Sequence, residues 1–290
     1  MLKADLDSLT PTRAFSRRDF VRTSVGSGFA AAVLPISAQA IRTDSTGLTS
    51  GEVTIPVADF KMPAYRAMPA GKTNLPVVLV ISEIFGVHDY IADVARRFAK
   101  RGYLAIAPEL FVRQGDAQSY GEIAKLIAEV ISKVPDAQVM GDMDATVAWA
   151  KTNGGDTSKL AVTGFCWGGR ITWLYSAHNP AMKAGVAWYG RLVGAASPLT
   201  PKHPVELTGH LNGPVLGLYG GQDSGIPLDT VDKMKAALAT GSAAAKRSEF
   251  VVYPDAPHAF HADYRPSFRK DPAENGWKRC VAWFEANGVA

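Results

Sequence analysis

A cysteine, an aspartate and a histidine each follow a short apolar run of the sequence. Cys166 comes after KLAVTGF, Asp223 after GPVLGLYGGQ, and His258 after SEFVVYPDAP. A cysteine thiolate is a nucleophile, a histidine transfers protons, and an aspartate fixes the histidine tautomer and stabilises its imidazolium form. If the three runs are strands of one sheet, these residues form a Cys-His-Asp triad for acyl transfer, in the chain order nucleophile, acid, histidine.

Two glycines flank the cysteine and favour a tight turn there. Cys166 lies between Gly164 and Gly168 in the spacing Gly-x-Cys-x-Gly. A nucleophile at a sharp turn between strand and helix needs close backbone packing, which a Cβ atom would obstruct. The Trp167 amide would then lie at a helix N-terminus and stabilise a developing oxyanion. The alternative is a small buried cysteine in a glycine-rich turn, and the acid and histidine at later strand ends favour catalysis over it.

The segments that must position these residues alternate between strand and helix. Strands are predicted at residues 52–57, 64–68, 76–82, 103–108, 159–165, 184–190, 213–220 and 248–254. Helices are predicted at residues 89–102, 120–131, 136–151, 169–178, 231–238 and 273–288. Helical connections imply right-handed crossovers and a parallel sheet with helices on both faces, whose site lies beyond the carboxyl ends of the strands. We therefore predict an α/β-hydrolase fold with a mostly parallel central sheet of about eight strands and an antiparallel start.

Length and composition suit one large domain. The chain has 290 residues, of which 47% are hydrophobic and 20% charged, and its formal net charge is +4. A chain of this size buries a sizeable core. The sequence has no basic run or stripe that would indicate a nucleic-acid partner. We predict a leader over residues 1–40, a linker over residues 41–52 and a single catalytic domain over residues 53–290.

Neither a metal nor a cofactor is expected. The sequence contains no His-Glu-x-x-His pattern, no cluster of cysteines and histidines, and no Gly-x-Gly-x-x-Gly after a strand. Of the two cysteines, Cys280 shares a helical face with Trp277, Val281 and Phe284, and we expect it to pack in the core. Two cysteines in a chain this long do not indicate a disulfide framework.

The N-terminal segment resembles a twin-arginine export signal. Arg17, Arg18 and Phe20 occupy the main positions of that signal, and an uncharged stretch rich in small residues follows. AQA at residues 38–40 is typical of a cleavage site, so we expect cleavage after Ala40. The alternatives are a transmembrane anchor, for which the stretch is barely long enough and only weakly apolar, and a tail without an export function. The signal implies that the twin-arginine translocase exports the folded protein to the periplasm or the cell exterior.

The residues around the triad candidates are similar to those of one family. The segments SEIFGVHDYI, GFCWGGR, GGQD and PHAFH occur in this order, and the likeness extends from about Val53 to the C-terminus. In these segments the chain resembles the dienelactone hydrolase family, the carboxymethylenebutenolidases of the α/β-hydrolase superfamily. The cysteine is a specific feature, because most α/β-hydrolases carry serine there. The resemblance implies that Cys166, Asp223 and His258 are the catalytic triad.

The same resemblance gives roles to two residues of SEIFGV. It implies that Glu83 takes part in switching Cys166 between a resting thiol and an active thiolate when substrate binds. A cysteine that rests as a thiol is less open to oxidation. The Ile84 amide is implied to be the second oxyanion donor, beside that of Trp167. A salt bridge near a loop or helix is the alternative role for Glu83.

Arginines bind the substrate carboxylate in this family, so the resemblance implies an anionic substrate. Arg113 in PELFVRQGD occupies one of the two matching positions. The second position lies four residues after the catalytic histidine, where this chain has Ala262. We expect Arg265 or His261 to take that role, and the departure leaves the exact substrate open. A surface ion pair is the alternative for Arg113.

The expected activity is hydrolysis of a carboxylic ester or lactone. A dienelactone is the favoured substrate, and it would give a maleylacetate-type product as in the family. A broader esterase or thioesterase for small acyl substrates is the first alternative, because ring-cleavage catabolism is normally cytoplasmic and does not suit an exported protein. A non-catalytic binding protein of the same fold is the second alternative. We expect the protein to act as a monomer.

Overall fold

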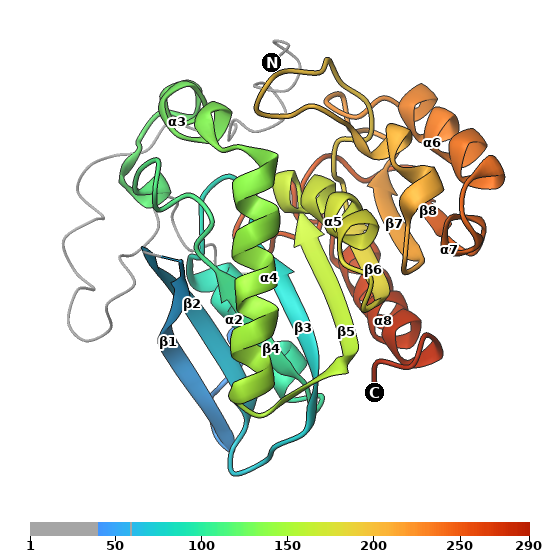
Figure 1. Cartoon of the computed structure of the whole chain (residues 1–290). Coiled ribbons are helices and arrows are strands. Elements are labelled where there is room, and N and C mark those ends of the chain that lie inside the picture. The colour runs from blue at the N-terminus through green and yellow to red at the C-terminus, as the bar shows by residue number, and fades with distance from the viewer. Residues whose placement is uncertain (1–39, 59) are drawn as a thin grey trace.

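The described part of the chain folds around one eight-stranded sheet (Figure 1). The structure is a computed structural model that describes residues 40–58 and 60–290, so the predicted export signal, with Arg17, Arg18 and Phe20, lies outside the described residues. The strands are β1 (Leu48–Val57), β2 (Phe60–Pro69), β3 (Leu75–Ile81), β4 (Leu104–Pro108), β5 (Gly155–Phe165), β6 (Met182–Trp188), β7 (Val215–Gly220) and β8 (Glu249–Tyr253). Their order across the sheet is β1-β2-β4-β3-β5-β6-β7-β8.

Six strands form the parallel part of the sheet and two precede it. The strands β3 to β8 pair in parallel, whereas β2 pairs antiparallel with both β1 and β4. Together with helices on both faces, this order confirms the predicted α/β-hydrolase fold and its antiparallel start. The first strand is longer than expected, because β1 begins at Leu48 and residues 48–52 of the predicted linker pair with β2. Most residues of β1 are only partly buried, and several of them are polar. The start of this strand therefore lacks the apolar run by which the other strands were predicted.

Helices cover both faces of the sheet. They are α2 (Asp89–Ala99), α3 (Ile123–Glu129), α4 (Asp136–Thr152), α5 (Trp167–His178), α6 (Leu228–Thr240), α7 (Ala243–Lys246) and α8 (Lys270–Ala286). Helices α4 and α5 lie on one face, and α2 and α8 lie on the other (Figure 1). Within the described residues, no helix is both long enough and apolar enough to span a bilayer.

The central strand β3 contributes to a hydrophobic core on each face. Val78 and Val80 pack in the core that contains α2 and α8, whereas Val77, Leu79 and Ile81 pack in the core that contains α4 and part of α5. All five side chains are fully buried. Successive side chains of a strand point to opposite faces, which is why a strand covered on both sides is apolar throughout. Each such side chain contributes about 1.5–3 kcal/mol of burial free energy, which anchors the strand whose end carries part of the site.

The candidate site residues lie just beyond the carboxyl ends of the parallel strands. The residues that follow these ends are Glu83 after β3, Glu109 after β4, Cys166 after β5, Asp223 after β7 and His258 after β8. Because the ends of parallel strands meet at one edge of a sheet, residues far apart in the sequence approach one another there.

Candidate active site

Cys166 occupies a strained turn between β5 and α5. Its backbone has φ 55° and ψ −113°, a left-handed region that non-glycine residues rarely adopt. The turn is tight because its glycines touch backbone. A Cβ atom on Gly168 would lie 2.4 Å from the Ile81 carbonyl oxygen, and one on Gly164 would lie 2.1 Å from the Gly168 oxygen. The sequence spacing Gly-x-Cys-x-Gly is therefore a packing requirement of this turn.

His258 and Asp223 form a hydrogen-bonded pair. The Nδ1 atom of His258 lies 2.6 Å from Oδ2 of Asp223, and both side chains are buried. The other carboxylate oxygen, Oδ1, accepts hydrogen bonds from the amides of Gly225 and Ile226 at 2.9 and 3.2 Å. These bonds orient the carboxylate, which in turn fixes the imidazole ring and leaves its Nε2 atom for chemistry.

The electrostatic surroundings favour a protonated His258. Burial lowers the pKa of this imidazole, but the negative charge of Asp223 and the interaction with Cys166 outweigh burial and raise it to about 10. An imidazolium close to a cysteine stabilises the thiolate form, which is the nucleophile. Cys166 itself is partly exposed and free of any disulfide, so a small molecule can reach it.

The two predicted oxyanion amides lie on neighbouring pieces of backbone. Trp167 is the first residue of α5, where an amide has no acceptor within the helix. Ile84 follows the end of β3, and among the described residues its amide has no hydrogen-bond acceptor. The contact of Gly168 with the Ile81 and Ser82 carbonyls brings the end of β3 against the start of α5. Both amides are therefore placed near the nucleophile turn.

Glu83 is a fully buried carboxylate with two partners. The Tyr264 hydroxyl donates a hydrogen bond of 2.6 Å to its Oε2 atom. On the other side, Nη1 of Arg265 lies 3.6 Å from Oε1. A buried carboxylate is costly to keep in a fold unless it is paired and hydrogen-bonded. Among the described residues, Oε2 has the hydrogen bond, whereas Oε1 has only the longer contact with Arg265. Sequence reasoning missed Tyr264, because a tyrosine within HADYRPS carries no recognisable motif.

Arg265 is a buried cation of the same cluster. It is only 6% exposed, and its guanidinium lies over the Phe85 ring at 5.7 Å. Burial lowers the pKa of Arg265, but the interactions with Tyr264, Glu83 and Cys166 raise it by more than burial lowers it. The net shift is upward, and the side chain stays charged. The structure thus brings Arg265 together with Glu83, and its substrate-binding role stays a prediction.

Arg113 and His261 make other contacts. Arg113 donates two hydrogen bonds to Asp142 of α4, at 2.5 and 2.7 Å, and lies over the Phe60 ring. His261 is buried with its Nδ1 atom 2.6 Å from the Tyr90 hydroxyl. Burial holds the pKa of His261 well below its ordinary value, so this ring is neutral. The structure does not place either side chain in the Glu83 cluster, and their substrate-binding roles stay predictions.

Another carboxylate near this site, the partly buried Glu109, was missed although it directly follows β4. Its Oε2 atom accepts the Val87 amide at 2.8 Å, and burial raises its pKa to about 7. Gly86 has φ 73°, and a Cβ atom there would lie 2.8 Å from the carboxylate. Glu109 therefore braces the loop that contains Glu83 and Ile84. Its position after a strand was the available signal.

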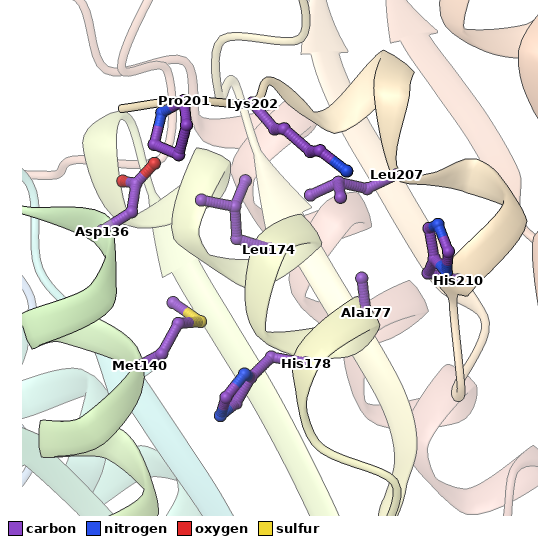
Figure 2. Close-up of a pocket in the computed structure, with 9 residues that line it drawn as sticks. All are labelled: Asp136, Met140, Leu174, Ala177, His178, Pro201, Lys202, Leu207 and His210. Atoms are coloured by element: carbon purple, nitrogen blue, oxygen red, sulfur yellow. The ribbon is translucent and has the colours of Figure 1, made fainter. Parts of the chain in front are cut away.

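A cavity of about 380 Å³ lies elsewhere (Figure 2). It is bordered by α4, α5 and the segment 201–210, and its walls include Met140, Leu174, Lys202 and Leu207. No triad candidate lines it, so the candidate active site is defined by side-chain geometry and not by this cavity. Within residues 40–58 and 60–290, no group of three or more histidines, cysteines and carboxylates could hold a metal ion.

The fold and the strand-end arrangement are those of an α/β-hydrolase. The model of the dienelactone hydrolase family matches residues 62–288. A candidate carboxymethylenebutenolidase of Methylorubrum extorquens is 60% identical over 289 residues, which cover 99% of this chain and 98% of that protein. A candidate carboxymethylenebutenolidase of Escherichia coli K12 is 51% identical over 267 residues, which cover 92% of this chain and 97% of that protein. The chain belongs to the dienelactone hydrolase family and is a carboxylic ester hydrolase.

Solved structures agree with this assignment. A candidate dienelactone hydrolase from Klebsiella pneumoniae is 55% identical and superposes with a TM-score of 0.80 over 82% of this chain and 98% of that chain. A dienelactone hydrolase-like promiscuous phosphotriesterase from metagenomic libraries is 21% identical, with a TM-score of 0.69 over 83% of this chain and 99% of that chain. At that identity the second likeness shows the fold alone.

The Tyr264 hydroxyl is expected to stabilise the fold through Glu83. Tyr264→Phe leaves a buried carboxylate oxygen without its donor and should lower the free energy of unfolding by about 1–3 kcal/mol. In a Glu83→Gln background the same substitution should cost less, with a coupling of at least about 0.5 kcal/mol in the double-mutant cycle. Urea unfolding of the four proteins measures this coupling.

Tyr253→Phe is the matched control for that cycle, because its hydroxyl bonds Asn275 in an exposed position. It should change stability by no more than about 0.5 kcal/mol. Equal costs of Tyr264→Phe in both backgrounds would show that its hydroxyl does not act through Glu83.

Proposed function

We propose that the protein hydrolyses a carboxylic ester or lactone with Cys166 as nucleophile, His258 as proton carrier and Asp223 as its orienting acid. The observation that carries the proposal is the strained turn at Cys166, built against backbone on both sides, together with the 2.6 Å bond between His258 and Asp223. A positive φ at a cysteine is costly and persists where a function requires that position.

The proposed reaction has two halves. The Cys166 thiolate attacks the carbonyl carbon, and the amides of Trp167 and Ile84 stabilise the oxyanion. The carbon–oxygen bond of the ester then breaks, and the leaving oxygen takes the proton of the His258 imidazolium. Neutral His258 next removes one proton from water, and the water oxygen attacks the thioester carbon. The carbon–sulfur bond then breaks, and the carboxylic acid product leaves and loses its remaining proton to solvent. The thiolate and the imidazolium are restored at the end.

Glu83 is proposed to control when the thiolate exists. By family resemblance it takes part in the exchange between thiol and thiolate, and here Tyr264 and Arg265 hold its carboxylate away from solvent. An anionic substrate that attracts Arg265 would weaken the contact between Arg265 and Glu83. That change is a physical route from substrate binding to nucleophile activation.

A dienelactone is the proposed substrate, and a broader small-acyl esterase or thioesterase is the second candidate. The relatives' names and the buried Arg265 beside the site favour a small anionic lactone. The bidentate pairing of Arg113 with Asp142 favours the second candidate, because it occupies an arginine that the family uses for the substrate carboxylate.

Cys166→Ala is expected to abolish hydrolysis. Removing a triad nucleophile lowers kcat by orders of magnitude, because only substrate binding and the oxyanion amides remain. The purified protein and the variant should be assayed side by side against a dienelactone, p-nitrophenyl esters and acyl thioesters. Cys280→Ala is the matched control and should leave the rate unchanged, since that thiol is fully buried in α8. Unchanged hydrolysis by Cys166→Ala would refute the triad, and no hydrolysis of any ester by the native protein would favour a binding protein.

Arg265 is expected to select anionic substrates. Arg265→Met removes the proposed charge-assisted contact between the guanidinium and the substrate carboxylate, which is worth about 1.5–3 kcal/mol. The kcat/KM ratio for an anionic ester over a matched neutral ester should therefore fall about tenfold to a hundredfold. Arg113→Met should leave the ratio unchanged if Asp142 keeps that guanidinium engaged. The opposite pattern would assign carboxylate binding to Arg113.

We also propose export through the twin-arginine translocase, followed by cleavage after Ala40 and action as a monomer. The signal residues and the AQA sequence support the export and the cleavage. In cell fractionation, the native chain should reach the periplasm or medium as a species that begins with Ile41, whereas Arg17→Lys with Arg18→Lys should stay in the cytoplasm at full length. Mass spectrometry of the N-terminus distinguishes the two. Equal distribution of both proteins would contradict export by this route.

A further inference from the structure

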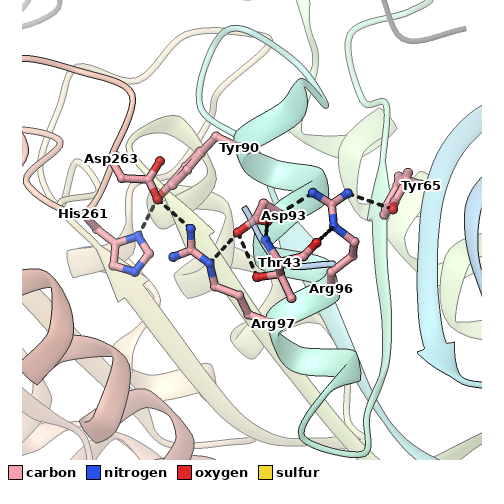
Figure 3. Close-up of polar contacts among 8 residues, drawn as sticks. All are labelled: Thr43, Tyr65, Tyr90, Asp93, Arg96, Arg97, His261 and Asp263. Atoms are coloured by element: carbon pink, nitrogen blue, oxygen red, sulfur yellow. Dashed lines mark hydrogen bonds and ion pairs between the residues drawn. The ribbon is translucent and has the colours of Figure 1, made fainter. Parts of the chain in front are cut away.

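The first described residues are attached to α2 by a network of polar contacts (Figure 3). The Thr43 amide donates to Oδ1 of Asp93 at 2.5 Å, and Nε of Arg96 donates to the Thr43 carbonyl at 2.8 Å. Further along, Lys100 bonds the Asp44 carboxylate at 3.0 Å. This segment begins directly after the predicted cleavage position, and it is held in place before the first strand starts.

The same network continues inward to the loop that carries His258. Arg97 pairs with Asp93 at 2.6 Å and with Asp263 at 2.5 Å, so it joins α2 to this loop (Figure 3). Asp263 is only 2% exposed. Burial raises its pKa, and Arg97 with the Ile41 backbone amide opposes that shift without cancelling it. Because the Asp263 carboxylate is almost fully buried, a further positive charge beside it would stabilise its charged form.

Ile41 lies against this carboxylate. Its backbone amide donates a hydrogen bond to Asp263. Ile41 also borders a cavity of about 250 Å³ together with Arg97 and His261. The remaining wall of the cavity comes from the segment before α8 and from α8 itself, including Trp277. The hydrogen bond places the backbone nitrogen of residue 41 beside a buried acid, and the cavity places Ile41 beside Arg97, the partner of that acid.

We infer that Asp263 is the binding site for a new N-terminus, the α-ammonium group of Ile41. The inference goes beyond the proposed hydrolysis and rests on the proposed cleavage after Ala40. Hydrolysis of the Ala40–Ile41 peptide bond adds one water: Ala40 leaves with a carboxylate, and Ile41 keeps an amine that takes up a proton. A neutral amide with one N–H then becomes a cation with three, at the position where Asp263 already accepts a hydrogen bond.

The ion pair has a consequence for the active site because of where Asp263 lies in the chain. The next two residues, Tyr264 and Arg265, are the ones that hold Glu83, and His258 lies five residues before it. Fixing Asp263 more firmly to the start of the chain restricts this loop from one side. Cleavage would therefore stabilise the loop that supplies both the catalytic histidine and the partners of Glu83.

The charges around the ammonium group set its pH dependence. Arg97 from α2, His261 from the loop, and Glu274 and Lys278 from α8 border the same cavity as Ile41. Asp93 of α2 accepts the Thr43 amide two residues further along. An α-amino group has an ordinary pKa of about 7.7–8.0, which an adjacent carboxylate raises. The stabilisation is therefore complete below about pH 7.7 and is lost as the pH rises through the raised pKa. It is also lost at acid pH, when Asp263 becomes protonated.

The test uses the full chain with residues 37–40 replaced by the recognition sequence of a protease that cleaves directly before Ile41. One preparation is melted before and after cleavage. At pH 7 cleavage should raise Tm by about 2–4 °C, the shift that about 1 kcal/mol gives in a chain of this size. The gain should shrink towards pH 10, and amide hydrogen exchange in residues 258–265 should slow after cleavage.

Three matched proteins complete the test. Moving the recognition sequence two residues upstream leaves Gln39 as the new N-terminus, and this displaced ammonium should give no gain. Asp263→Asn should abolish the gain, whereas Glu274→Gln should keep it. Equal Tm values before and after cleavage, or the same gain in the displaced control, would overturn the inference. Because the cut is made in vitro, such a result leaves the export proposal standing, and a leader that is never removed in cells would refute only the proposed cleavage.

Discussion

The backbone contact at Gly168 is the constraint on which the site depends. The Cα atom of this residue, the second of α5, lies so close to the Ile81 and Ser82 carbonyls that no side chain fits between them. This contact locks the start of α5 against the end of β3. It thereby sets the separation between Cys166, the proposed nucleophile, and the residues that follow β3, including Glu83. The two hydrophobic cores on either side of β3 make the contact rigid, because neither strand nor helix can withdraw without exposing apolar surface.

Several buried charged and polar side chains of the site come from one loop. Residues 258–265 supply the imidazole that bonds Asp223, the acid that binds Arg97, and the tyrosine and arginine that hold Glu83. Each of these groups would be expensive to bury alone, and each is acceptable because its partner comes from another element. The loop is therefore fixed by polar contacts, whereas the sheet below it is fixed by apolar packing. A site held in this way responds to charges brought in by a ligand.

Much of this arrangement is visible in the sequence, because strand ends and chain order are local properties. Apolar runs predicted the strands, and the residues after them gave Cys166, Asp223 and His258. The pairing of side chains was not predictable in the same way. Asp142 meets Arg113 and Tyr264 meets Glu83 only through the tertiary fold, across 29 and 181 residues of chain. No local pattern marks such a partner, and a surface strand such as β1, half exposed and polar, carries too weak an alternation to show where it begins.

The complete burial of Cys280 has a consequence for the chemical lifetime of the protein. The sequence has two cysteines, and the second is enclosed in α8, where burial raises the pKa of its thiol far above the ordinary value. A thiol in that state neither reacts nor reaches a partner. If Cys166 is oxidised to a sulfenic acid, the chain offers no second thiol to trap it as a disulfide, and further oxidation to sulfinic acid is irreversible. Repair therefore depends on a thiol supplied by another molecule.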